Sequence, residues 1–280
     1  MTIFTKSFIK TLFAFSLIIT ISACNTKEAK KESEVKTEKK QKKKKVKRPV
    51  SIKRGKIFTK NGRKMLYGGK DSLQHFDITD YDLKDEGFHY GIGREFFPAL
   101  LKPQFTTVQK ADSIWNDDAR FLVAYSGNEI KAYAIKDLIR HEIVNDVLNG
   151  EPIMAAYCIL ADLGAIYDRK YGNKTLTFAL SGYTYHDEKV WNDLDGFILW
   201  DRETESLWWP LINKAVSGPL KGVKLLEKNK NNWEDTTWGE IKKTYPTAKV
   251  LISGQDFERP KTWKKINNVS SIVNSFTKKD

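Results

Sequence analysis

The stretch HEIVNDVLNGEPIMAAYC (residues 141–158) decides the fold, because a strong turn signal lies between two apolar runs. Asn149-Gly150 favours a two-residue type I′ turn, in which both residues adopt positive φ angles. With these two residues in the loop, Pro152 falls at a non-hydrogen-bonded position of the ladder, where no backbone N–H is needed. The stretch therefore predicts an antiparallel hairpin that the chain extends on both sides.

Followed outward, the same register places His141 opposite Cys158, in a close pair with Cα atoms about 4.5 Å apart. Asn145 lies on the same face of the hairpin. A histidine beside a cysteine can lower the pKa of the thiol and make it a nucleophile or redox group. It can also supply two ligands to copper or zinc. The default is inert packing, because free cysteines are among the most buried residues.

Three further pairs of apolar runs flank turn signals at 126–128, 172–173 and 202–205. Helical patterns are confined to 106–115 and 236–245, and the second begins with a Thr237/Glu240 capping box and ends before Pro246. Short strands joined by tight turns are typical of antiparallel β proteins. We expect an α+β fold that is mainly antiparallel β, sandwich or barrel-like, with a few short helices, in one domain spanning 57–280.

The first 23 residues have the layout of a bacterial lipoprotein signal peptide: Lys6 and Lys10, an apolar run, and then small residues before Cys24. The four residues ISAC (21–24) resemble a lipobox, so we expect cleavage before Cys24 and acylation of its thiol and new amino group. Acyl chains would hold the protein on a membrane. An ordinary signal peptide or an anchor helix that happens to contain cysteine is the alternative. We expect an extracytoplasmic location in a bacterial envelope.

Residues 24–56 predict a disordered tether, because they are dense in Lys and have no periodic apolar face. Residues 25–56 hold 15 Lys and Arg but only 4 Glu. Together with Lys6 and Lys10 they account for the whole net charge of +13, so 57–280 is formally neutral. We therefore expect no nucleic-acid partner for the folded part. The tether could attract anionic lipids or an envelope polymer, or serve only as a spacer.

Other residues offer weaker candidates. Arg94, after Gly91 and Gly93, could reach an anionic ligand, although a solvated surface arginine is the default. The acidic stretch 75–89 is interpreted as a solvated loop rather than a cation site, and RETE (202–205) as a hairpin turn rather than a pair of catalytic acids. Four tryptophans could form a platform for a glycan or partner, but core packing is favoured for them: Trp191, Trp200, Trp208 and Trp209.

Several motifs resemble a bacterial family known only as domain of unknown function three-one-seven-nine. They are ALLKPQFTTVQKAD (99–112), NEIKAYAI (128–135), HEIVND (141–146), YC (157–158) followed by GAIYDR (164–169), TLTFALSG (175–182), DRETESLW (201–208), GPLKG (218–222) and TTWGE (236–240). The resemblance covers about 70–255. It implies an exported or lipid-anchored protein and carries no established activity.

Two departures from that family's pattern bear on chemistry. Its members commonly read YCPLC, whereas Ala161 stands here where the second cysteine would be. A dithiol cycle is therefore not available within this chain, and a metal site would have lost one ligand, which Asp162 could replace only with a shift of one residue. The family also tends to have Gln after SLW, whereas this chain has Trp209-Pro210.

Three functions follow as hypotheses. The first is an anchored monomer that binds copper, zinc or a small ligand at His141 and Cys158, with Asn145, Asp162 and Arg94 as further contacts. The second is a non-catalytic interaction module with an aromatic surface for a glycan or envelope protein. The third is a thiol redox protein. Ala161 disfavours this third hypothesis, the one that makes the chain an enzyme. Whether the chain is an enzyme stays open, with a non-catalytic protein favoured, and no Gly-x-Ser-x-Gly and no HExxH motif is present.

Overall fold

The computed structural model describes residues 53–190 and 194–254, and the hairpin at Asn149-Gly150 forms in the predicted register. β9 (Ile143–Leu148) and β10 (Glu151–Cys158) pair antiparallel, with Val147 opposite Pro152. Asn149 and Gly150 have φ angles of 48° and 81°, as a type I′ turn requires. β11 (Leu163–Asp168) pairs with the other edge of β10 and completes a three-stranded sheet.

The remaining strands form two larger and two smaller sheets. The six-stranded sheet has the order β1 (Lys53–Arg54), β5 (Phe88–Tyr90), β14 (Phe178–Tyr185), β15 (Gly196–Asp201), β16 (Leu207–Trp209) and β17 (Lys214–Ser217). The five-stranded sheet has the order β18 (Trp233–Thr237), β7 (Arg120–Ser126), β8 (Glu129–Ala134), β19 (Lys249–Leu251) and β6 (Phe105–Thr107). The smaller sheets are β2 (Ile57–Lys60), β3 (Arg63–Leu66) and β4 (Phe76–Asp77), and the ribbon of β12 (Lys170–Tyr171) and β13 (Lys174–Thr175).

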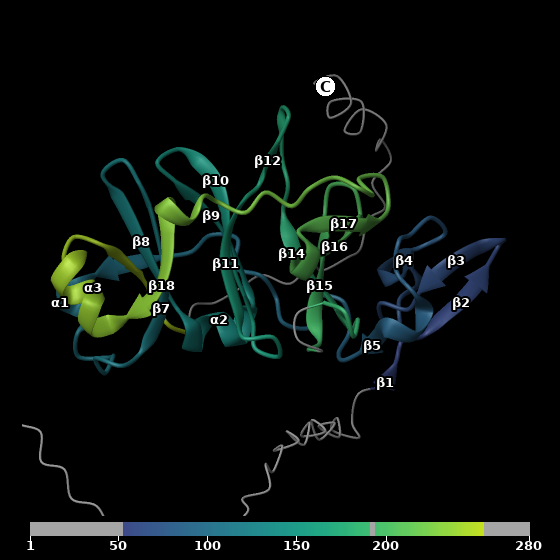
Figure 1. Ribbon diagram of the computed structural model, residues 1–280, viewed down its shortest axis with the longest axis horizontal. Coiled ribbons are helices and arrows are strands. Elements are labelled where there is room, and N and C mark those ends of the chain that lie inside the picture. The colour runs from purple at the N-terminus through teal and green to yellow at the C-terminus, as the bar shows by residue number, and fades with distance from the viewer. Residues whose placement is uncertain (1–52, 191–193, 255–280) are drawn as a thin grey trace, which may run out of the picture. The chain divides into compact units, whose positions relative to one another are not determined.

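The three-stranded sheet lies between the two larger ones, so both of its faces are buried (Figure 1). Met154 and Ala156 face the core shared with β14–β17. Val144 and Ala155 face the core shared with β7 and β8. Alternate side chains point to opposite faces of a strand, so a single hairpin supplies apolar residues to both cores.

Polar side chains on β9 fasten the three-stranded sheet to its neighbours. The Asn145 amide donates to the Phe178 carbonyl, and its oxygen accepts from the Phe178 N–H. On the other face Asp146 accepts hydrogen bonds from Lys131 Nζ and Tyr133 Oη. These groups are buried, so each bond removes a desolvation penalty that an unpaired group would impose.

The helices differ in how well the sequence predicts them. α3 (Trp238–Thr244) is confirmed, and its Thr237 hydroxyl accepts from the Glu240 N–H. Of 106–115 only α1 (Val108–Ala111) is helical, because residues before it extend β6. α2 (Ile135–His141) is not predicted from the sequence. It ends at Glu142, whose left-handed φ of 56° turns the chain into β9.

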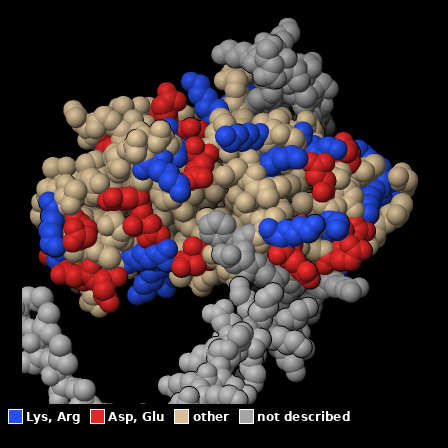
Figure 2. All heavy atoms as spheres, viewed as in Figure 1, with Lys and Arg blue, Asp and Glu red and all other residues tan. Residues whose placement is uncertain are grey.

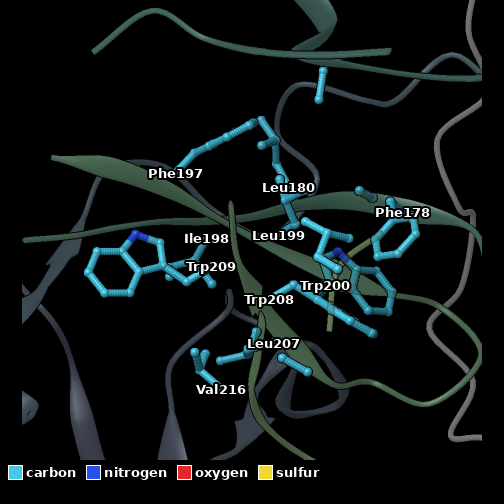
Figure 3. Packing of buried hydrophobic residues seen from close by; sticks show 14 of the residues in the cluster. Phe178, Leu180, Phe197, Ile198, Leu199, Trp200, Leu207, Trp208, Trp209 and Val216 are labelled. Carbon is cyan, nitrogen blue, oxygen red and sulfur yellow. The ribbon is translucent and has the colours of Figure 1, made fainter. Parts of the chain in front are cut away.

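The tryptophans of β15 and β16 pack in the core, as Figure 3 shows. Trp200, Trp208 and Trp209 are each at most 2% exposed. Trp208 meets the Phe178 ring edge-on at 5.5 Å, and Trp209 meets Tyr185 at 4.7 Å. Core packing is confirmed for these three, and an exposed aromatic platform made from them is wrong. Trp191 lies outside the described residues.

The prediction of an α+β fold dominated by antiparallel strands is confirmed, and the sheets stay open rather than closing into a barrel. Only β19 and β8 pair parallel among the described ladders. The fold already includes Lys53–Arg54, which the sequence placed in the tether. Gly55 and Lys56, also assigned to the tether, bond to Phe88 and Tyr67. Residues 1–52, with the signal segment and Cys24, lie outside the described residues.

Charges of both signs are mixed on the surface of the described part. On the face in view in Figure 2, Lys and Arg are interspersed with Asp and Glu, and the described residues form no single basic field there. Within 53–190 and 194–254, no helix has the length and apolarity needed to cross a bilayer.

Candidate ligand site

His141 and Cys158 do not form the strand pair that the sequence predicts. The ladder between β9 and β10 ends at Ile143 and Ala156. His141 is the last residue of α2, and Cys158 has a ladder partner only on the other edge of β10, in Leu163 of β11. Glu142 adopts a left-handed conformation that ends α2 and turns the chain, so β9 begins only after His141. The prediction of a cross-strand His141–Cys158 pair is therefore wrong, although the register from which it was extrapolated is correct.

The side chain of His141 is buried and bonds to the backbone. Its Nδ1 lies 2.9 Å from the carbonyl oxygen of Pro98. A carbonyl only accepts, so Nδ1 carries a proton and donates it. This bond attaches the end of α2 to the segment before β6, a packing role that a histidine at a helix C-terminus can fill.

The thiol of Cys158 lies beneath the turn that joins β10 to β11. Cys158 is a free cysteine and 2% exposed. Burial raises the pKa of the thiol to about 11, and the nearby charge on Glu142 adds to the rise. Backbone hydrogen bonds from Ala161, Phe197 and Leu160 oppose the rise in pKa but do not overcome it. The thiol is therefore protonated at neutral pH, the opposite of what a nucleophile or redox cysteine requires.

The residues around this thiol do not assemble a cluster of metal ligands. In the described part of the chain, no group of three or more His, Cys, Asp and Glu side chains could hold a metal ion. Asp162 is engaged elsewhere: it accepts from Tyr157 Oη at 2.8 Å and pairs with Arg120 at 2.6 Å. Copper or zinc binding by His141 and Cys158 stays a prediction without geometric support.

A different group of charged residues surrounds Arg94, which is buried rather than solvated as expected. Its guanidinium lies 3.5 Å from the centroid of the Trp200 ring and 4.6 Å from that of Phe76. It donates to Glu205 Oε1 at 3.1 Å. Stacking on an aromatic face suits a guanidinium and fixes its plane. Burial lowers the pKa of Arg94, which Glu205 partly offsets.

The RETE turn that follows β15 is held by a second set of interactions. Arg202 forms two hydrogen bonds with the carboxylate of Glu95, which is 2% exposed. Asp201 accepts from the Thr204 N–H, the Thr204 hydroxyl and Trp208 Nε1. Complete burial nevertheless raises the pKa of Asp201 to about 7. The turn is confirmed as a hairpin connection between β15 and β16. Within it, Glu203 accepts from the Thr177 N–H and Glu205 accepts from Arg94.

The RETE turn also forms one wall of a cleft of about 490 Å³. The cleft is lined by Arg63, Met65, His75, Asp77, Thr79, Asp80, Thr204, Glu205, Gly218 and Pro219. We call it the His75–Glu205 cleft. Its opposite wall comes from β3, β4 and the following loop, and of these the sequence assigned the part from His75 onward to a solvated acidic loop. The sequence missed this site because its two walls lie far apart along the chain.

Most charged groups that line the cleft have a partner of opposite charge. Arg63 pairs with Asp77 at 2.5 Å, Asp80 with Lys221, and Glu205 with Arg94. His75 accepts a hydrogen bond from the Gly68 N–H at its Nδ1. Burial lowers the pKa of His75, which favours the neutral ring. The cleft can therefore exchange hydrogen bonds with a ligand without presenting a strong field of one sign.

The comparisons with known proteins identify a family but no activity. A family model described as "Protein of unknown function (DUF3179)" matches residues 94–271. No curated protein and no solved structure matches the chain. The match begins at Arg94, so it includes the 204–219 wall of the cleft and leaves out the 63–80 wall.

Proposed function

The chain belongs to the DUF3179 family, and we propose that it is a lipid-anchored extracytoplasmic protein that binds a small, neutral, hydroxylated ligand in the His75–Glu205 cleft without chemically changing it. The single observation that carries the proposal is the cleft itself. Its walls combine carboxylates, an arginine, a neutral histidine and two threonines. Such a lining can donate to and accept from the hydroxyl groups of a sugar.

Binding is favoured over catalysis because the acids near the cleft already have structural roles. Glu205 pairs with Arg94, and the Thr204 hydroxyl is held by Asp201 at 2.8 Å. A general acid or nucleophile needs a group that is free to exchange a proton with the substrate. A rigid, prearranged lining suits a binding site, since little ordering is needed when the ligand enters.

The location rests on the sequence. Acylation of Cys24 after the apolar run would anchor the chain, and residues 25–52 would connect the anchor to the fold. Their lysines would add attraction to anionic lipids or to an acidic envelope polymer. We propose a monomer that has no nucleic-acid partner.

The test is calorimetric titration of the mature chain with uncharged sugars, glucose and N-acetylglucosamine, and with glucosamine 6-phosphate as the charged comparison. We expect binding of an uncharged sugar that weakens at least about tenfold in Arg63→Ala and in Glu205→Gln, because the first change removes a donor from the cleft wall and the second replaces a charged acceptor oxygen with an amide donor. Glu240→Gln on α3, whose carboxylate pairs with Lys243, is the matched control. The proposal would be contradicted if no uncharged sugar bound, or if the affinity were unchanged in both cleft variants.

The metal hypothesis competes with this one and has its own test. Titration of copper(I) and zinc into the mature chain and into Cys158→Ser measures any contribution of the thiol. The high pKa of Cys158 opposes metal binding, because a cysteine ligates as its thiolate. Tight binding that is lost in Cys158→Ser would favour the His141–Cys158 site over the cleft.

A further inference from the structure

The turn between β10 and β11 exposes two large aliphatic side chains. Ile159 and Leu160 are 50% and 52% exposed, whereas Cys158 and Ala161 on either side of them are buried. Tight turns normally carry Gly, Asn, Asp, Ser or Pro. We call Ile159 and Leu160 the apolar tip. Single exposed apolar residues are normal on a surface, whereas adjoining ones can mark a contact surface.

The backbone beneath the apolar tip is held in place, so the exposure is not a result of a loose loop. Main-chain groups of Leu160 and Ala161 form hydrogen bonds with the sulfur of Cys158. A third such bond comes from Phe197 in β15. Asp162, at the end of the turn, is bonded to Tyr157 and Arg120. The turn therefore presents Ile159 and Leu160 on a fixed support.

The tether enters the fold at β1, which a series of contacts links to the support of the apolar tip. The first described strand, β1, pairs with β5, where Arg54 lies opposite His89. The ring of His89 is bonded to Asp195 at 2.7 Å, and the next residues along that segment lead to Phe197, whose backbone contacts Cys158. Leu194, beside Asp195, is another exposed aliphatic residue, at 40%. Because β10 runs from the Asn149-Gly150 turn to Cys158, the tip lies at the opposite end of the three-stranded sheet from that turn.

We propose that the apolar tip contacts the surface of the bilayer in which Cys24 is anchored. This inference rests on the lipid anchor of the proposed function. Residues 25–52 lead from the anchor to β1, so they hold the tip at a high effective concentration beside the membrane. Under that condition two aliphatic side chains need only weak intrinsic affinity for the interface. The contact orients the folded part on the membrane.

The test uses the acylated mature chain in phosphatidylcholine vesicles, whose zero net charge removes electrostatic attraction of the tether. An environment-sensitive fluorophore (NBD) is placed on Leu160→Cys in a Cys158→Ser background, with Ile114→Cys as the matched control. Ile114 is also an exposed aliphatic residue, at 59%, and lies after α1. We expect at least a twofold rise in emission, with a blue shift, at position 160 on reconstitution, and no change at position 114.

The outcomes separate the two proposals. If the chain is not found with the vesicles, the lipid anchor of the proposed function is contradicted. If the chain is in the vesicles but positions 160 and 114 behave alike, the membrane contact of the tip is overturned while the anchor stands. A change at position 160 that depends on chain concentration without lipid would show that a second copy covers the tip, which also overturns the proposal. Quenching of Leu160→Trp by brominated phosphatidylcholine, with Cys158 unchanged, repeats the test should Cys158→Ser misfold.

Discussion

The buried sulfur of Cys158 is hydrogen-bonded by backbone groups of the β10–β11 turn, and this position determines the reactivity of the thiol. We predict that the native thiol reacts with Ellman's reagent at neutral pH at least about 100-fold more slowly than in the denatured chain. The reason is that a pKa of about 11, in place of the ordinary 9.0, lowers the thiolate fraction by about that factor before burial is considered. The measurement is the rate of reaction with and without denaturant.

A serine at position 158 can accept the same backbone hydrogen bonds, so Cys158→Ser should keep the fold at a cost of about 1 kcal/mol. A native rate equal to that of the denatured chain would show that the thiol is accessible and ionised, and would restore the redox hypothesis.

Asp201 makes the stability of the fold depend on pH. Its pKa of about 7 in the folded state lies above the ordinary 3.8, so the folded state holds this proton more tightly than the unfolded state. The resulting stabilisation is complete below the ordinary pKa and is lost as the pH rises through about 7. We predict that the free energy of unfolding falls by up to about 2 kcal/mol between pH 5 and pH 8 because of this group.

Urea denaturation of the chain and of Asp201→Asn at the two pH values measures this effect. The asparagine variant cannot titrate, so its loss between pH 5 and pH 8 should be smaller by the amount that Asp201 contributes. Asp168→Asn, at a partly exposed ion pair with Lys228, is the control. An identical pH dependence in the chain and in Asp201→Asn would refute the assignment.

At the scale of the element, the Asn149-Gly150 turn fixes the register of β9 and β10. We predict that Gly150→Ala lowers the free energy of unfolding by about 1 kcal/mol, because its φ of 81° is unfavourable for a residue with a Cβ. An added Cβ would meet no atom within 4 Å, so the effect comes from the backbone alone. Gly150→Asn should lose less, since asparagine tolerates the left-handed region better. Equal stability of all three chains, measured by urea denaturation, would argue against the turn type.

The hairpins could be predicted because their signals are local. Asn149-Gly150, the turn at 126–128 and the RETE connection are each specified by a few neighbouring residues. α2 could not, because KDLIRH is short and follows directly on the strand EIKAYA. α2 ends where Glu142 adopts a left-handed conformation, which cannot be predicted from a glutamate. The error over His141 follows from that one residue.

The candidate site was predicted less well than the fold. The sequence pointed to His141, Cys158 and Arg94, but it could not bring the 63–80 and 204–219 segments together. Of these three, only Arg94 is near the site we favour. It does not line the cleft, but it bonds to Glu205, which does. Sites made by long-range packing leave little trace in local patterns, whereas pairing around a turn leaves a strong one.

At the scale of the whole molecule, the sheet β9–β11 holds the fold together by supplying side chains to two cores at once. Its one end carries the apolar tip above Cys158. The six-stranded sheet carries the RETE turn, which connects the Arg94 cluster to the His75–Glu205 cleft. The two walls of the cleft come from different sheets, so the proposed ligand binding depends on the packing between them.

The anchor is the claim on which both the proposed function and the membrane contact depend. It is tested most directly by growing bacterial cells that express the full chain with radioactive palmitate and separating membranes from soluble protein. We predict that the chain carries label and is found with the membranes, and that Cys24→Ser carries none and is released. An unlabelled chain, or a Cys24→Ser chain that still carries label, would contradict the account.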